Sequence, residues 1–206
     1  MSKMSHCPWA GDDAQYIDYH DTEWGVPNGS DQKLFEKVVL EGFQAGLSWI
    51  TILRKRDHFR KVFDGFDAAK IARYRPAKIE KLMADTGIVR NRAKIEATIT
   101  NAQAYLEIQQ KGSFAGLLWD IVDGQITQNR FVTMADVPAE TAASKAMSKR
   151  LKGLGFRFVG PTTMYAFMQS MGMVNDHLVG CPRRAACAKL AKTFDAPTFE
   201  HGARAS

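Results

Sequence analysis

Two pairs of residues at opposite ends of the 206-residue chain have the types and spacing of a metal site. Cys7 and His20 are separated by twelve residues, and His177 and Cys181 by three. Two thiolates and two imidazoles form a closed tetrahedral set, which suits a structural zinc ion and leaves no position for an activated water. The second pair is the stronger half, because residues four apart lie on one face of a helical turn. If the pairs meet, they join the two ends of the chain.

The same residues also have simpler interpretations. A lone histidine is often a surface or hydrogen-bonded residue, and a cysteine is often simply buried. Cys187 and His6 are rival ligands for the same ion. The spacing alone therefore leaves the zinc hypothesis open.

A second segment, residues 82–95, combines a glycine with three basic residues and has the pattern of a helix, a tight turn and a second helix. Backbone N–H groups at the Gly87 turn can hold a phosphate, and Arg90, Arg92 and Lys94 supply positive charge. This pattern suits binding to DNA without reading its sequence. The alternative is an ordinary helical hairpin whose basic side chains are solvated.

A third region concentrates aromatic residues near the start of the chain: Trp9, Tyr16, Tyr19, Trp24 and Trp49. Aromatic faces can sandwich a planar base and attract a cationic one. Glu41 follows an apolar run and precedes two small-residue breaks, so its carboxylate can be buried and aimed into a pocket. A lone buried carboxylate is costly, and a cationic base would relieve it. The alternative is a solvent-facing Glu41 on an amphipathic helix, with the aromatic residues in the core.

The elements that position these residues are predicted to be helices, because apolar residues recur at helical spacing and period-two alternation is almost absent. Ser30 or Asp31 can cap one helix and Asp67 another, and Pro76 can open a third that Gly87 ends in the left-handed conformation. About eight helices are expected in an all-α fold. If the chain ends meet, residues 1–206 form a single globular unit with two lobes. The expected parts are lobe 1 at about 1–30 plus 140–184, lobe 2 at about 31–139 with a helical hairpin at 77–110, and a loosely ordered tail at 185–206.

Charge and composition indicate the partner and the compartment. The net charge of +6 and a pI near 9.3 favour a polyanionic partner, with nucleic acid as the leading candidate. Three cysteines cannot all pair, and the first residues lack the apolar core of a signal peptide, so we expect a cytoplasmic protein. The longest uncharged run, residues 158–175, is too polar to span a membrane.

Five longer motifs resemble the DNA-3-methyladenine glycosylase I family, and the likeness covers roughly residues 7–181. The motifs are residues 16–27 (YIDYHDTEWGVP), 40–51 (LEGFQAGLSWIT), 87–95 (GIVRNRAKI), 152–160 (KGLGFRFVG) and 174–177 (VNDH). The resemblance implies an all-α, two-lobed helix-hairpin-helix DNA glycosylase whose terminal segments are joined by one structural zinc. The implied zinc ligands are Cys7, His20, His177 and Cys181.

The resemblance also implies roles for the aromatic region. Glu41, as the catalytic residue, Tyr16 and Trp49 would form the base pocket, with Trp9 and Tyr19 as weaker candidates. The segment from Gln44 to Leu47 would lie near the gap left by a flipped nucleotide, and Gly87, Arg90 and Lys94 would contact DNA.

The implied activity is monofunctional hydrolysis that excises 3-methyladenine from alkylated double-stranded DNA, by a monomer that releases the free base. One departure concerns the catalytic aspartate of many helix-hairpin-helix glycosylases, whose position holds Asn175 here. Asp176 is expected to point elsewhere, and no residue is assigned as a Schiff-base lysine. Both points fit an enzyme without a lyase step, because a cationic methylated base is already a good leaving group. The alternative is a non-catalytic, zinc-stabilised helix-hairpin-helix DNA-binding protein.

Overall fold

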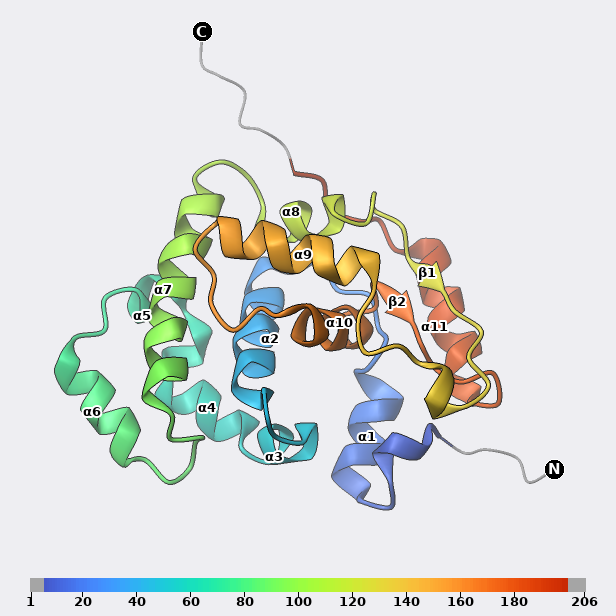
Figure 1. Ribbon diagram of the computed structural model, residues 1–206, viewed down its shortest axis with the longest axis horizontal. Helices are drawn as coiled ribbons and strands as arrows, with labels where there is room; N and C mark the ends of the chain where they lie inside the picture. Colours follow the sequence, from blue (N-terminus) through green and yellow to red (C-terminus); the bar gives the residue numbers. More distant parts are fainter. Residues whose placement is uncertain (1–5, 200–206) are drawn as a thin grey trace, which may run out of the picture.

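The computed structural model describes residues 6–199 and is mostly helical (Figure 1). Its α-helices are α1 (Ala14–Thr22), α2 (Asp31–Gln44), α3 (Trp49–Leu53), α4 (Arg56–Val62), α5 (Ala68–Ile71), α6 (Pro76–Ala84), α7 (Arg92–Gln109), α8 (Phe114–Asp120), α9 (Ala142–Gly153), α10 (Pro161–Ser170) and α11 (Pro182–Thr193). Short 3₁₀ turns are η1 (Pro8–Ala10), η2 (Asp64–Phe66) and η3 (Met134–Asp136), and β1 (Thr127–Gln128) pairs in parallel with β2 (Val174–Asn175). The helical fold class is confirmed, with more and shorter helices than expected. No helix of the described residues is long and apolar enough to cross a membrane.

Several helix starts follow from local capping chemistry. The Ser30 hydroxyl accepts from the Lys33 N–H at the start of α2, and Asp67 accepts from the first N–H groups of α5. Pro76 occupies the first turn of α6, where its missing N–H costs nothing. These three predicted helix starts are confirmed.

Gly87 has a different structural role from the predicted left-handed helix cap. Helix α6 already ends at Ala84, and a Cβ atom on Gly87 would lie 2.2 Å from the ring of His58. That ring contacts the Asp85 carboxylate at 2.9 Å, and the same carboxylate accepts from the Gly87 N–H at 2.7 Å. Glycine is therefore required here by close packing, and its N–H already has a partner.

Helix α2 lies at the centre of the fold and positions the candidate site. It packs against α3, α7, α8 and α10, with the α4 to α7 group on one side and α1, α11 and the strand pair on the other (Figure 1). Every residue from 37 to 43 is buried. A helix buried on all sides belongs to the core, so the two charged residues in this run, Lys37 and Glu41, must find partners inside the protein.

Two features of the structure concern the expected parts of the chain. Strand β1, at 127–128, pairs with β2, at 174–175, so a segment expected in lobe 2 lies against the C-terminal part of the chain. The tail expected to be loosely ordered begins at residue 185, but α11 extends through it to Thr193. Cys187 on this helix is buried. Phe194 then packs against Trp119, with ring centroids 4.8 Å apart. These two anchors are too few to produce a helical pattern in the sequence. The last expected tail residues, 200–206, lie outside the described residues.

Candidate functional site

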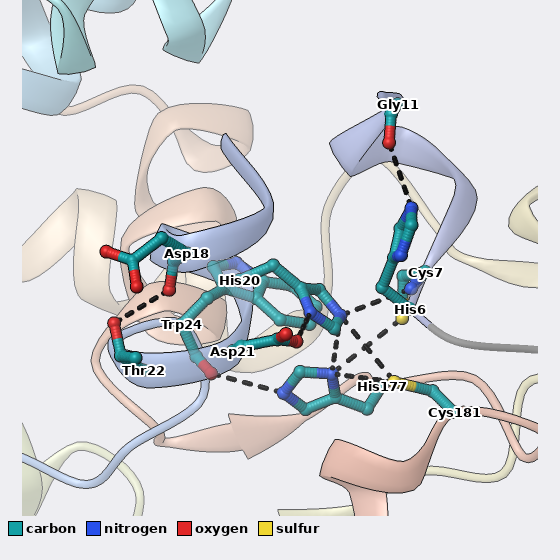
Figure 2. Close-up of polar contacts among 10 residues, drawn as sticks. All are labelled: His6, Cys7, Gly11, Asp18, His20, Asp21, Thr22, Trp24, His177 and Cys181. Carbon is teal, nitrogen blue, oxygen red and sulfur yellow. Dashed lines mark hydrogen bonds and ion pairs between the residues drawn. The ribbon is translucent and has the colours of Figure 1, made fainter. Parts of the chain in front are cut away.

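Cys7, His20, His177 and Cys181 meet in one buried cluster, with all four ligand atoms within 4.8 Å of one another (Figure 2). His20 Nε2 and His177 Nδ1 are 3.2 Å apart, and Cys181 Sγ lies 3.6 Å from each. Tetrahedral Zn–N bonds of about 2.0 Å and Zn–S bonds of about 2.3 Å imply edges of about 3.3 Å between two nitrogens and about 3.5 Å between nitrogen and sulfur. The cluster therefore has the dimensions of a tetrahedral site with two nitrogen and two sulfur ligands.

Neighbouring groups fix the orientation of both imidazoles. His20 Nδ1 lies 2.7 Å from the Asp21 carboxylate, and His177 Nε2 donates to the Trp24 carbonyl at 3.1 Å. Figure 2 draws both contacts. Each ring therefore turns its other nitrogen toward the cluster. Hydrogen-bond partners orient metal-binding histidines in the same way. The pKa of Cys181 is lowered, first by the hydrogen bond from Cys7 and then by the imidazoles, which stabilises a thiolate.

The two rival ligands are neighbours of this cluster but do not belong to it. His6 Nε2 contacts the Gly11 carbonyl at 2.9 Å. Cys187 is buried on α11 near Gly25 and is not part of the four-residue group. The structure therefore brings together the four residues that the family resemblance implied, without either rival.

A cavity of about 300 Å³ collects the aromatic residues singled out from the sequence. Its N-terminal wall consists of Trp9, Tyr16, Tyr19, Trp24, Glu41, Gln44 and Trp49. The rings of Trp9 and Tyr16 meet edge to face at 5.0 Å, and those of Tyr19 and Trp49 are 5.4 Å apart. The remaining lining residues come from later in the chain: Met134, Val137, Pro138, Ala139, Thr162, Tyr165, Ala166, Gln169, Ser170 and Asp176. The cavity is small and mostly apolar, with a few convergent polar groups, as expected of a ligand site.

Glu41 is buried in this cavity wall, but its carboxylate is not the lone charge that the sequence suggested. Its Oε1 atom lies 2.9 Å from the Nζ atom of Lys37, one helical turn earlier. Burial raises the pKa of Glu41, and the nearby ammonium opposes that rise. Burial and the Glu41 charge raise the pKa of Tyr16 to about 12, so this phenol stays protonated. An unpaired carboxylate was predicted because one lysine among many gives no sign that it is buried.

Gln44 to Leu47 form a tight turn at the C-terminal end of α2. Gly46 has a φ of +85°, and the Leu47 N–H donates to the Gln44 carbonyl at 2.6 Å. The Gln44 side chain lines the cavity, whereas the Leu47 side chain is 45% exposed. The turn thus presents one polar side chain to the cavity and one apolar side chain to solvent.

Of the predicted DNA contacts, Arg90 is exposed but Lys94 is buried. Lys94 Nζ donates to the carbonyls of Phe43 at 3.0 Å and Ala45 at 2.6 Å. These carbonyls belong to the last turn of α2, which leaves backbone acceptors without helical partners. Lys94 therefore caps α2 in this structure, and its predicted contact with a phosphate stays a prediction.

Asp176 is the main residue that sequence reasoning misplaced. It lines the cavity and accepts hydrogen bonds from Asn129 at 2.7 Å, Gln169 at 2.8 Å and the Tyr165 hydroxyl. Asn175, by contrast, is buried outside the cavity lining and donates to Gln128 at 2.8 Å. The VNDH motif was the available signal, but one residue of register decided which side chain faces the cavity.

A helical protein with a closed donor cluster beside an aromatic, carboxylate-containing cavity has the architecture of a base-recognising enzyme, and comparisons with known proteins agree. Residues 9–184 match the family described as methyladenine glycosylase. The chain is 49% identical over 179 residues to DNA-3-methyladenine glycosylase 1 of Escherichia coli K12, covering 86% of this chain and 96% of that protein. It is 50% identical over 179 residues to the DNA-3-methyladenine glycosylase of Haemophilus influenzae, covering 86% and 97%.

Solved structures give the same result. A crystal structure of 3-methyladenine DNA glycosylase I matches with a TM-score of 0.85 and 49% identity, covering 86% of this chain and 98% of that one. A Staphylococcus aureus structure described as the basis of 3-methyladenine recognition matches with a TM-score of 0.85 and 36% identity, covering 89% and 98%. The chain therefore belongs to the methyladenine glycosylase family of enzymes.

Proposed function

We propose that this protein is a monofunctional repair glycosylase that extrudes 3-methyladenine from alkylated double-stranded DNA and hydrolyses its bond to deoxyribose. It would act as a cytoplasmic monomer and release the free base. The observation that carries the proposal is the buried Glu41 carboxylate within a wall of five aromatic rings. Aromatic faces and a carboxylate favour a planar cation over neutral adenine, and methylation at N3 makes adenine cationic.

Two further groups suit recognition of a purine. The indole N–H groups of Trp9 and Trp49 are buried without a hydrogen-bond partner among the described residues. A buried donor without a partner is costly, so each is suited to donate to an acceptor atom of an extruded base. Glu41 would accept from the extruded cationic base, which becomes neutral when it takes the electron pair of the glycosidic bond.

The proposed reaction has no lyase step. Since the leaving base is already positively charged, selective extrusion and binding provide much of what catalysis requires.

Zinc is the metal that best fits the cluster of Cys7, His20, His177 and Cys181. With four protein ligands the site is closed, so its role would be to stabilise the fold by joining residues near both ends of the chain. When bound, the ion supplies coordination bonds only.

DNA binding is assigned to the face that carries the α6 to α7 hairpin and the Gln44 to Leu47 turn. The exposed Arg90 would contact the phosphate backbone, and exposed Leu47 would enter the gap left by the flipped nucleotide. Within the predicted helix-hairpin-helix at residues 77–110, the Gly87 N–H is engaged by Asp85, so it would contact phosphate only if that bond opens.

The test is chromatography of free bases released from methylated DNA, run beside calorimetry with free 3-methyladenine. Glu41→Gln keeps the shape and removes the charge, and we expect it to fold but lose about 10- to 100-fold in base affinity and release, as expected for one charged hydrogen bond. Glu36→Gln on the same helix is the matched control, because Glu36 pairs with Arg60 away from the cavity. Release of no base by the wild-type protein, with DNA binding intact, would favour the non-catalytic DNA-binding alternative.

A further inference from the structure

One buried ammonium group contacts three residues of the base cavity at once. Lys37 is 6% exposed, and its Nζ atom lies 2.9 Å from Glu41 Oε1 and 3.0 Å from the Tyr19 hydroxyl. The same atom lies 3.2 Å from the ring centroid of Trp49. These are the groups that the proposed function assigns to a cationic base.

Lys37 reaches them from behind. A second cavity, of about 650 Å³, shares Tyr19 and Trp49 with the base cavity. Lys37 lines this second cavity and does not line the base cavity. The ammonium therefore covers one face of the Trp49 indole from outside the base cavity. A base that enters the cavity can stack on Trp49 without displacing Lys37.

We propose that Lys37 is a positioning residue of the base pocket, whose fixed ammonium keeps Glu41 ionised and holds its carboxylate against the cavity. The inference rests on the proposed function and deepens it. A carboxyl group buried among aromatic rings favours the neutral form, and a protonated Glu41 would carry no charge to attract a cation. An adjacent positive charge within hydrogen-bonding distance restores the charged form.

Other charged groups near the pair do not replace Lys37. Tyr16 and Tyr19 face Glu41 from α1, and burial raises the pKa of both phenols, so they stay neutral across the assay range. Asp176 lines the same cavity and accepts hydrogen bonds from Asn129, Gln169 and Tyr165.

Behind the cavity, Arg56 is bound through two hydrogen bonds of 2.6 and 2.7 Å to the Glu23 carboxylate. The positive charge of Arg56 is therefore largely balanced by the negative charge of Glu23. Burial lowers the pKa of Lys37, and the Glu41 charge opposes that fall, so the two charges sustain each other.

The test compares Lys37→Met, which keeps the length of the side chain and removes its charge, with Lys37→Arg, which keeps the charge. Lys33→Met, one turn earlier on α2 and exposed, is the matched control. In protein labelled with ¹³C at glutamate side chains, the Glu41 carboxyl is titrated by NMR without DNA. We expect its midpoint to rise by about one pH unit or more in Lys37→Met and to stay unchanged in Lys33→Met.

Single-turnover base release from methylated DNA is then measured across pH. In Lys37→Met, the pH below which the rate of base release falls should rise by the same amount as the Glu41 midpoint. In Lys37→Arg this pH should equal that of the wild-type protein. If Lys37→Met fails to fold, Lys37→Gln carries the same expectation. An unchanged Glu41 midpoint overturns the inference, and so does an equal loss of release at every pH, which indicates packing alone. If the Glu41 midpoint shifts in Lys37→Met but the wild-type protein releases no base, the proposed function is refuted. The effect of Lys37 on the ionisation of Glu41 would still hold.

Discussion

Replacing Lys94 tests whether this lysine supports the fold or binds DNA. Lys94→Met keeps the side-chain length but removes both hydrogen bonds to the end of α2. A hydrogen bond to a charged group contributes about 1.5–3 kcal/mol, but Ala45 is exposed and its carbonyl can be hydrated, so we expect a total loss of about 2–3 kcal/mol. In a protein of this size each kcal/mol lowers Tm by about 2–4 °C, which predicts a fall of roughly 4–12 °C.

The assay pairs thermal unfolding with DNA-binding titrations across salt on two unrelated duplexes. Lys94→Met should lower Tm and leave the salt slope unchanged. Arg90→Ala, at an exposed position of the same hairpin, should leave Tm unchanged and reduce the slope by about one unit, equally on both duplexes. A Lys94→Met protein with normal Tm and a reduced slope would refute the capping role and restore Lys94 as a phosphate contact.

Three further expectations concern the cluster, the hairpin and the turn. Cys181→Ser should lose the tightly bound zinc, whereas Cys187→Ser should retain about one ion per chain by metal analysis. Gly87→Ala should destabilise the protein by about 1–3 kcal/mol in denaturant unfolding, because its Cβ would meet the His58 ring, and adding His58→Ala should recover part of that loss. Leu47→Ser should slow base release from duplex DNA and leave calorimetric affinity for free 3-methyladenine unchanged, and equal losses in both would contradict a role at the flipped nucleotide.

The parts of the molecule that the sequence predicted are those decided locally or by residue type. The side chains of Ser30 and Asp67 accept hydrogen bonds from backbone N–H groups at the start of a helix. Pro76 starts a helix because a first-turn residue needs no N–H group. The four cluster residues could be found because few side chains bind metal, and their types remain informative even when they are far apart in sequence.

The rest depended on contacts between distant segments. Lys37 and Lys94 have the same composition signal as an exposed lysine, and the acceptors of Lys94 lie about fifty residues away in α2. Asp176 was placed away from the cavity because the register of a two-residue strand is not encoded by any repeating pattern. Cys187 anchors α11 with too few apolar neighbours to produce periodicity.

The four-residue cluster is joined along the chain to two residues that line the cavity. His20 directly follows Tyr19, and His177 directly follows Asp176. His20 Nε2 and His177 Nδ1 lie 3.2 Å apart, so the cluster ties together two segments of the cavity lining that are 157 residues apart in sequence. The four residues that could hold an ion therefore also fix how these two segments lie relative to each other.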